Sequence, residues 1–247
     1  MNVNEKLQIN DGSEPAEGKF YRSLVGGLIY LCLTRPDIAF PVGVVSRFMH
    51  NPSKVHLGAA KRILRYVAGT QNFGLWYTAN SDFKLKGFTD SDWANSLEDR
   101  RSISGQIFFL GSCAVSWSSK KQPTAALSSS EAEYMAATAS ACQAIWLRRL
   151  LKDLGQEQEG ATEIFSDNKS TISMAKNPAF HGRTKHIDTR HHFIRELVAT
   201  EQIVLNYCST DEQLADVLTK ALPLKKHSHF CSCFALCKFE SRGSVEN

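Results

Sequence analysis

The sequence lacks the features that mark membrane-spanning and secreted proteins. No apolar run approaches the roughly 18 residues that a helix needs to cross a bilayer. The first 18 residues are polar and hold no apolar signal-peptide core. The seven cysteines are an odd number without regular spacing, which argues against a disulfide-stapled domain. We therefore expect an intracellular protein, cytoplasmic or nuclear, with reduced thiols and no membrane partner.

Extremes of composition are absent as well. Of the 247 residues, 43% are hydrophobic and 22% are charged, which is ordinary for a soluble globular protein. This length suffices for two small domains or one large domain. The formal net charge of +4 permits a polyanionic partner without requiring one. Nothing in the composition predicts the oligomeric state.

Hydrophobic patterning divides the chain into four parts. Residues 1–18 carry few large apolar side chains and are expected to form a flexible lead-in. Apolar residues recur at helical spacing through 19–73, which predicts a small all-helical segment. Residues 74–222 alternate strand-like and helix-like patterns and are expected to form the main domain. Residues 223–247 show no clear period and are interpreted as an irregular tail.

The main domain begins with short aromatic or alternating runs and continues with helices. Strand-like runs lie at 74–78, 83–89, 106–110, 114–117, 162–166 and 203–208. Helical patterns lie at about 130–154, between 167 and 177, at 186–200 and at 211–221. An antiparallel start followed by alternating elements implies a mixed sheet covered by helices. The predicted fold class is therefore α/β.

Acidic residues stand at the ends of several of these elements. They are Asp90, Asp92, Glu131, Glu133, Asp167 and Asp216. In an open α/β sheet the strand ends meet the helix starts, where functional sites assemble. Several carboxylates converging there would repel one another unless cations neutralised them. Oxygen-only ligation suits Mg²⁺ or Mn²⁺, and two such ions about 3.5–4 Å apart can activate water against a phosphodiester.

Each acid also has a structural interpretation. Asp90 and Asp92 could be turn residues. Either glutamate could close a capping box, because Ser128 with Glu131 and Ser130 with Glu133 both fit Ser-x-x-Glu. Asp167 could cap the helix that follows it, and Asp216 could be a solvated helix residue. The ordered set of acids is more informative than any member alone.

Several motifs in a fixed order resemble one known family. Within residues 86–222 they are Phe88-Thr-Asp-Ser-Asp-Trp-Ala94, Leu127-Ser-Ser-Ser-Glu-Ala-Glu-Tyr-Met-Ala-Ala137, Phe165-Ser-Asp-Asn-Lys-Ser170, Thr184-Lys-His-Ile-Asp188 and Gln213-Leu-Ala-Asp-Val-Leu-Thr-Lys220. This region resembles the ribonuclease H part of copia-type retrotransposon polyproteins. Upstream, Tyr21-Arg-Ser-Leu-Val-Gly-Gly-Leu-Ile-Tyr30, Thr34-Arg-Pro-Asp37 and Arg62-Ile-Leu-Arg-Tyr-Val-Ala-Gly-Thr70 resemble the end of the reverse transcriptase of the same polyproteins.

The resemblance implies a ribonuclease H-like fold, a mixed five-stranded sheet with flanking helices that follows the small all-helical segment. It implies an Asp-Glu-Asp-Asp set holding two Mg²⁺ ions, with Mn²⁺ as a substitute. These positions fall on Asp90, Glu133, Asp167 and Asp216. Glu133 is preferred to Glu131 because Glu133-Tyr-Met-Ala-Ala137 aligns with the family's catalytic glutamate, which is followed by small and apolar residues. Residues two apart on a helix point to different sides, so we expect only one of the two to reach the metals, which leaves Ser128 and Glu131 as the cap. Asp92 is the second choice on the first strand.

The chain also departs from the family pattern. Many ribonucleases H carry a histidine in a loop before the last aspartate, whereas residues 209–212 contain none. His186, His191 and His192 come earlier and are interpreted as structural or solvated. The polymerase signature Tyr-x-Asp-Asp is missing, so no polymerase active site is expected.

The implied substrate is an RNA–DNA hybrid, and the remainder of a polyprotein is the implied partner. A polyanion calls for basic and hydroxyl side chains near the site. The candidates are Arg100, Arg101, Ser104, Lys120, Lys121, Lys169, Arg183 and Lys185. The alternative for each basic residue is a solvated surface position.

Two hypotheses for the function follow. The first is an endonuclease that hydrolyses the RNA strand of RNA–DNA hybrids by two-metal catalysis. The second is a catalytically inert, nucleic-acid-binding relic of the polyprotein. The His and Cys residues of the tail do not favour a zinc site, because Cys231 and Cys233 are too close for a standard ligand pair.

Overall fold

The computed structural model describes residue 3 and residues 5–78, 83–176 and 188–239; for 188–192 it describes the backbone alone. The chain forms two compact units. One spans residues 80–220, and the other combines residues 1–79 with 221–247. Among the described residues, no helix is both long and apolar enough to span a membrane.

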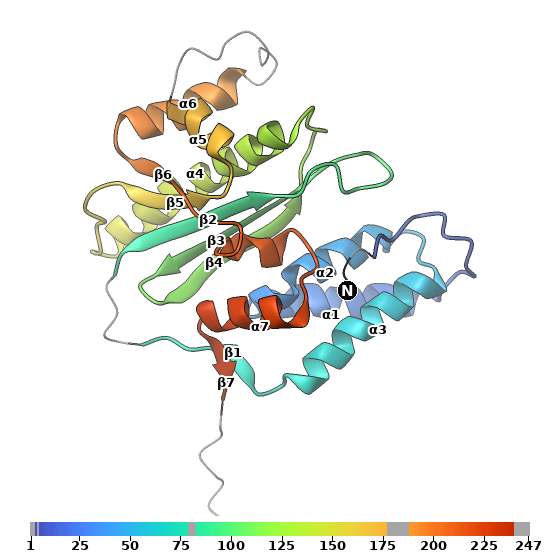
Figure 1. Cartoon of the computed structure of the whole chain (residues 1–247). Coiled ribbons are helices and arrows are strands. Elements are labelled where there is room, and N and C mark those ends of the chain that lie inside the picture. Colours follow the sequence, from blue (N-terminus) through green and yellow to red (C-terminus); the bar gives the residue numbers. More distant parts are fainter. Residues whose placement is uncertain (1–2, 4, 79–82, 177–187, 240–247) are drawn as a thin grey trace, which may run out of the picture. The chain divides into compact units, whose positions relative to one another are not determined.

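A five-stranded mixed sheet organises the unit of residues 80–220 (Figure 1). Its strands are β2 (Leu85–Ser91), β3 (Ile103–Leu110), β4 (Cys113–Lys121), β5 (Thr162–Ser166) and β6 (Ile203–Tyr207). Their order is β4-β3-β2-β5-β6. The first three strands pair antiparallel, and β5 runs parallel to both β2 and β6. Gly111, in the turn between β3 and β4, has a φ of 63°, a conformation that glycine adopts without strain.

Three helices cover one face of this sheet (Figure 1). They are α4 (Ser129–Asp153), α5 (Lys169–Lys176) and α6 (Asp188–Ala199). Alternate strand residues such as Leu85, Phe108 and Ile164 join Tyr134 and Ile194 from the helices in one buried cluster. Burying such large apolar side chains from the sheet and the helices stabilises the folded state by roughly 1.5–3 kcal/mol for each side chain. The ribonuclease H-like architecture, a mixed five-stranded sheet with flanking helices, is confirmed.

A short 3-10 helix, η4 (Leu214–Leu218), packs on the sheet where the sequence predicted a longer helix. The Gln213 side chain accepts from Ala215 N and donates to Thr89 O, which ties the start of η4 to β2. At the other end, Ser119 Oγ donates to Leu218 O. These side-chain contacts take the place of further helical turns, so the element is shorter than predicted.

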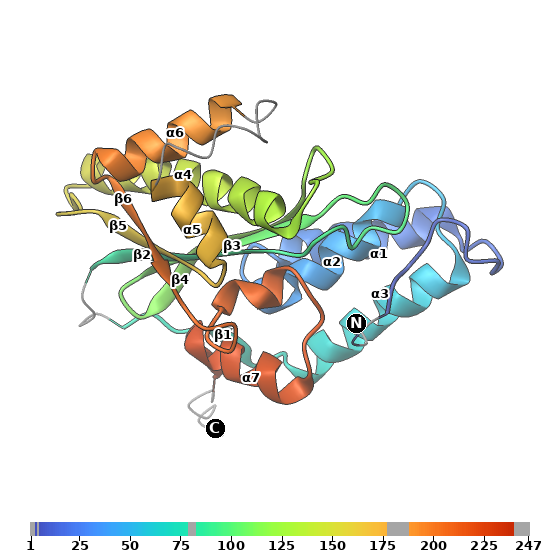
Figure 2. The ribbon, with the colours of Figure 1, turned by 45° about the horizontal axis from the view of Figure 1, so that its top comes forward.

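The second unit is mainly helical. Its elements are α1 (Gly18–Leu31), η1 (Pro36–Ile38), α2 (Ala39–Val45), η2 (Ser46–Phe48), α3 (Lys54–Gly69), β1 (Phe73–Leu75), α7 (Leu224–Cys233) and β7 (Leu236–Lys238). The predicted helices at the start of the chain are present. Strand β1 pairs antiparallel with β7 in a separate two-stranded sheet (Figure 1). Helices α3 and α7 of this unit are labelled in Figure 2.

The predicted irregular tail holds regular structure in its described part, residues 223–239, which corrects that prediction. Helix α7 and strand β7 occupy most of it. Phe230, Phe234 and Leu236 are almost completely buried. Their burial supplies the stabilisation that a weak sequence period does not reveal. Residues 74–79, which the sequence assigned to the main domain, also belong to this unit.

The lead-in likewise makes fixed contacts in its described part. Pro15 forms a β-bridge with Ser53, and Ser53 Oγ donates to Asp11. The buried His56 ring lies 2.9 Å from Gln8 O and stacks on Phe48. The lead-in is therefore held at the start of α3, rather than free as its polar composition predicted.

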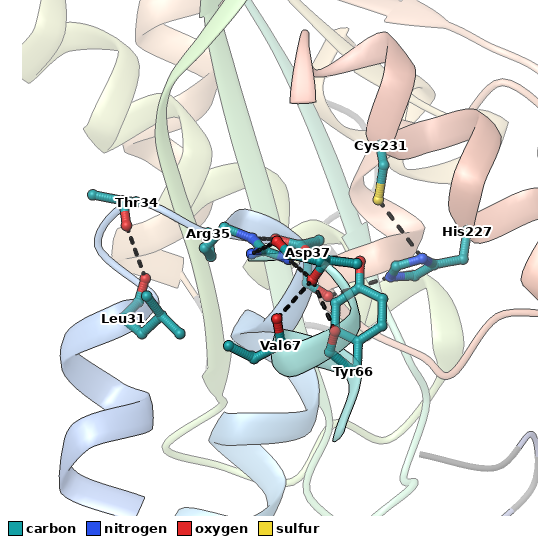
Figure 3. A network of polar contacts seen from close by, with 9 residues as sticks. Leu31, Thr34, Arg35, Asp37, Tyr66, Val67, His227 and Cys231 are labelled. Atoms are coloured by element: carbon teal, nitrogen blue, oxygen red, sulfur yellow. Dashed lines mark hydrogen bonds and ion pairs between the residues drawn. The ribbon is translucent and has the colours of Figure 1, made fainter. Parts of the chain in front are cut away.

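A buried polar network links α7 to the helices of this unit (Figure 3). Asp37 accepts from Arg35 Nε at 2.9 Å, from Arg35 Nη2 at 2.7 Å and from Tyr66 Oη at 2.7 Å. His227 on α7 lies 3.3 Å from Asp37 O and meets the Tyr66 ring edge-on. Cys231 Sγ is 3.6 Å from His227 Nδ1. Burial, with the Asp37 charge adding to it, raises the pKa of Tyr66 far above its ordinary value, so the phenol remains a donor.

We expect Asp37→Asn to destabilise this unit by about 3–5 kcal/mol, because it leaves the buried Arg35 guanidinium without its counter-charge. Denaturant unfolding of the full chain measures the loss. Glu5→Gln is the matched control, since it breaks the more exposed Arg62–Glu5 ion pair. The control should cost no more than about 1 kcal/mol. Equal losses in the two variants would contradict the structural role of the network.

Candidate metal centre

Two neighbouring strands deliver two of the predicted acids to one place. Asp90 is the penultimate residue of β2, and Asp167 follows the last residue of β5 directly. Because β2 and β5 are parallel, their carboxyl ends lie at the same edge of the sheet. Glu133 adds a third carboxylate from the second turn of α4.

These three side chains form a tight cluster. One carboxylate oxygen from each of Asp90, Glu133 and Asp167 lies within 4.8 Å of the others. Asp90 is 2% exposed and Glu133 is 7% exposed, while Asp167 is half-buried. The structure thus brings together three of the four acids in the predicted set.

The fourth acid, Asp216, reaches the same region from η4. It is fully buried, and its Oδ1 lies 2.7 Å from Lys220 Nζ. Lys220 Nζ is also 3.8 Å from Asp90 Oδ2, and Thr219 Oγ1 donates to that same oxygen. Asp216 is therefore connected to the cluster through Thr219 and Lys220.

A glycine allows η4 to come this close to the sheet. Gly105 stands opposite Asp90 in the β2–β3 ladder. A Cβ atom at this position would lie 2.7 Å from Thr219 Cγ2, 2.9 Å from Leu218 Cβ and 3.0 Å from Ala215 O. Such distances are too short for a side chain, so the absence of one at residue 105 helps to set the position of Asp216 and Thr219.

Burial makes the ionised form of this cluster costly. Burial raises the pKa of Asp90 to about 6; Lys220 opposes the rise and Asp216 adds to it. Burial, reinforced by the charges of Asp90 and Asp167, raises the pKa of Glu133 to about 10. Carboxylates this close cannot all ionise unless positive charge is supplied among them.

The donor set fits a hard divalent cation. Glu133 Oε2 is buried and has no hydrogen-bond partner among the described residues. A buried acceptor without a partner is costly, and a cation bound there would remove that cost. All the candidate ligands are carboxylate oxygens, which suits Mg²⁺ or Mn²⁺ rather than zinc.

Comparison with known proteins places the chain in a family. It is 47% identical over 219 residues to the retrovirus-related Pol polyprotein from transposon TNT 1-94 of Nicotiana tabacum, a match covering 88% of this chain. It is 40% identical over 232 residues to the retrovirus-related Pol polyprotein from transposon RE1 of Arabidopsis thaliana, covering 94% of this chain. The chain belongs to the retrotransposon Pol polyprotein family. It spans 16% of the length of each of these two relatives.

Comparisons with protein-family models and with solved structures add little to this family assignment. No protein-family model matches it. The crystal structure of LC11-RNase H1 in complex with RNA/DNA hybrid is 13% identical, with a TM-score of 0.41, and the match covers 55% of this chain and 94% of that chain. Since that TM-score is low, the fold of the Pol segment is assigned from its own strand order and register.

The structure also distinguishes the alternatives for the neighbouring acids. Ser128 Oγ accepts from Glu131 N, and Glu131 Oε2 accepts from Leu127 N, so Glu131 closes the start of α4 as the sequence predicted. Asp92 Oδ1 accepts from Ile103 N and holds the start of β3. Neither residue belongs to the described three-acid cluster.

The sequence also allows Asp167 to cap the helix that follows it. The neighbouring Asn168 fills that role, because its Oδ1 accepts from Thr171 N at 3.1 Å. Asp167 Oδ2 instead accepts from Thr210 Oγ1 at 2.9 Å. This leaves the Asp167 carboxylate directed toward the cluster rather than toward α5.

The proposed nucleic-acid contacts fall into several environments. Ser104 and Lys120 are paired in the β3–β4 register and line a groove of about 640 Å³ beside α4. Lys121 lines the same groove, and both it and Arg101 form ion pairs with Asp99.

The remaining basic candidates lie elsewhere. Arg100 is exposed, and Lys169 lies over the Tyr207 ring. Arg183 and Lys185 lie outside the described residues, as do the side chains of His186, His191 and His192. The groove begins close to the acids, because Ser104 also pairs with Ser91, the residue after Asp90.

A larger hollow, of about 780 Å³, lies at the opposite end of the same strands. Lys84, Lys86 and Glu163, from the starts of β2 and β5, line it together with Arg148. Arg148 donates hydrogen bonds to Gly160 O, in the loop before β5, and to Thr162 Oγ1, at the first residue of β5. Asp90 and Asp167 come from the other ends of these strands, so this hollow is not part of the candidate centre.

Sequence reasoning missed two residues of the centre, Thr219 and Lys220. Both lie at the end of the motif that contains Asp216, and their spacing of three and four residues was the available signal. On a helical turn this spacing brings side chains to one face. The contacts with Asp90 could not be inferred, since they span 129 or more residues of sequence.

Proposed function

We propose that this Pol segment is a ribonuclease H-type endonuclease that hydrolyses the RNA strand of RNA–DNA hybrids. The observation that carries the proposal is the cluster of Asp90, Glu133 and Asp167, with the buried oxygen Glu133 Oε2, for which the described part of the chain supplies no hydrogen-bond partner. Asp216 completes the set through Lys220 and Thr219. Membership in the Pol polyprotein family is consistent with such a substrate.

The carboxylates would hold Mg²⁺, or Mn²⁺ in its place. When bound between such groups, paired divalent ions supply a water activated at neutral pH and stabilise the leaving oxygen of a phosphodiester. The protein residues position this chemistry. Thr219 fixes the orientation of the Asp90 carboxylate by a hydrogen bond, and Ser128 with Glu131 fixes the helix start that presents Glu133.

The groove beside α4 is the proposed path of the nucleic acid. Lys120 and Lys121 supply positive charge and Ser104 supplies a hydroxyl along its wall, close to the cluster. Contacts of this kind position a phosphate backbone without reading its sequence. Cleavage would leave a 3′-hydroxyl and a 5′-phosphate. The partners are thus the hybrid and the remainder of the polyprotein.

The test is a cleavage assay with an end-labelled RNA–DNA hybrid and Mg²⁺. We expect the unmodified chain to cut the RNA strand, and Asp167→Asn to lose at least about a thousandfold in rate, equivalent to about 4 kcal/mol of barrier. Asp153→Asn, on the exposed end of α4, removes the same charge away from the cluster and should cut normally.

Binding of the hybrid is measured in parallel, so that binding and cleavage are separated. If the unmodified chain binds the hybrid but leaves it intact with Mg²⁺ and with Mn²⁺, the enzyme proposal fails. The chain would then be the catalytically inert, nucleic-acid-binding relic of the second hypothesis.

A further inference from the structure

The four acids of the centre are not equivalent. Asp90, Glu133 and Asp167 face one another at distances that a single cation can span. Asp216 is absent from that three-acid group and instead has an ammonium group 2.7 Å from its Oδ1. The same ammonium is 3.8 Å from Asp90 Oδ2. A positive charge therefore already lies between Asp90 and Asp216.

The ammonium belongs to Lys220, whose backbone is firmly held. Lys220 N donates to Asp216 O, one turn back. The preceding η4 is fixed by Ser119 at one end and by Gln213 at the other. The side chain, however, is 41% exposed, so its flexible stem reaches solvent while its charged end meets the two acids.

The ammonium of Lys220 lies between two carboxylates, 2.7 Å from Asp216 Oδ1 and 3.8 Å from Asp90 Oδ2. A divalent cation approaching Asp90 and Asp216 would meet this like charge at short range, and like charges in a partly buried site repel strongly.

We propose that Lys220 occupies the cation position between Asp90 and Asp216, so that the substrate-free protein offers one open divalent position, formed by Asp90, Glu133 and Asp167. A second divalent ion binds between Asp90 and Asp216 only after the Lys220 side chain swings out to solvent. Lys220 is thus a positioning residue that keeps Asp90 and Asp216 together and sets the affinity for the second ion. The inference rests on the proposed function, because it concerns the same metal centre.

The test is Mn²⁺ binding to the full chain, with stoichiometry and affinity measured by calorimetry and by the paramagnetic resonance signal of free Mn²⁺. The unmodified chain should bind one ion tightly. Lys220→Met, which keeps the stem and removes the charge, should bind a second ion at least about tenfold more tightly than the unmodified chain does. Lys152→Met removes an equal charge from an exposed ion pair with Glu157 and should match the unmodified chain.

Two melting measurements complete the test. Without divalent ions, Lys220→Met should melt at a lower temperature than the unmodified chain, and Mn²⁺ should raise its melting temperature by more. If Lys220→Met does not fold, Lys220→Gln carries the same expectations, because its amide can still donate to Asp216. Identical second-ion affinities in the unmodified and Lys220 variant chains would overturn the proposal.

The outcomes for the two proposals are separable. One Mn²⁺ bound equally by every variant, with hybrid cleavage intact, refutes the role of Lys220 and leaves the nuclease in place. Absence of any Mn²⁺ binding, with or without hybrid, refutes both.

Discussion

Glu133→Gln should make the metal-free protein more stable while removing its proposed activity. At neutral pH the folded protein must hold a proton on Glu133, whose pKa is raised to about 10, whereas the unfolded chain ionises freely. A neutral amide of the same shape avoids that cost. We expect a gain on the order of 1–3 kcal/mol in unfolding free energy without divalent ions.

The same substitution should remove the response to divalent ions. An amide oxygen is a weaker ligand than a carboxylate, and one of the three charges of the cluster is gone. Thermal unfolding with and without Mg²⁺ should therefore show little difference, and hybrid cleavage should fall at least about a thousandfold. A protein that gains stability and loses function together identifies a site whose charges are held against their mutual repulsion.

Glu131→Gln is the matched control, two residues away on the same helix. Glu131 accepts from Leu127 N at the helix start, and glutamine can accept there as well. We expect this variant to retain its cleavage, its Mg²⁺ response and its stability within a few tenths of a kcal/mol. If Glu133→Gln behaved like this control, Glu133 would not be a metal ligand.

The stability of the metal-free protein should fall as the pH rises from 5 to 8. Asp90 and Glu133 have raised pKa values, about 6 and about 10, so the folded state binds more protons than the unfolded state across this range. Stability decreases with pH wherever the folded state holds the extra protons. Asp90 contributes below about pH 6, and Glu133 contributes across the whole range. Titration of the unfolding free energy at fixed ionic strength measures the slope.

Divalent ions should reverse this dependence. Binding requires the ionised carboxylates, so the stabilisation by Mg²⁺ should grow as the pH rises. In Glu133→Gln the decline above pH 6 should disappear, while the decline below pH 6, due to Asp90, should persist. The facing groups Asp167, Asp216 and Lys220 are present in both proteins and so cancel in the comparison. An unchanged slope in the variant would contradict the assignment to Glu133.

Acidic groups elsewhere act in a different pH range. Hydrogen bonds from Ser53 and Ser13 lower the pKa of Asp11 to about 2. Its contribution is present above the unfolded-state value near 4 and is lost only as the pH falls toward 2. Asp11 therefore adds little to the slope between pH 5 and 8.

The local pattern predicted most elements of the sheet unit correctly. Alternating apolar residues indicated the strands, and Gly111-Ser112 indicated the turn between β3 and β4. The choice between Glu131 and Glu133 came from the family motif, because capping-box spacing fits both glutamates. These features depend on neighbours in the chain, which a pattern records.

Features that depend on distant contacts were missed or wrongly interpreted. Residues 223–247 were predicted to be irregular, but α7 and β7 form there and Phe230 and Phe234 are buried. The Arg35–Asp37–Tyr66 network draws on residues up to 31 positions apart, and His227 adds a residue 190 positions from Asp37. A short polar or mixed segment shows no period of its own when another part of the chain supplies its core.

The sequence by itself determined which acids could form the centre. Acids at the ends of β2 and β5 and at the start of α4 follow from local hydrophobic patterns and from the family motifs. Only the tertiary structure decided how those acids are shared. It joined Asp90, Glu133 and Asp167 in one cluster and paired Asp216 with the ammonium of Lys220. The reason is that the charge a carboxylate meets depends on chain segments brought together by the packing of η4 against Gly105, which no local pattern encodes.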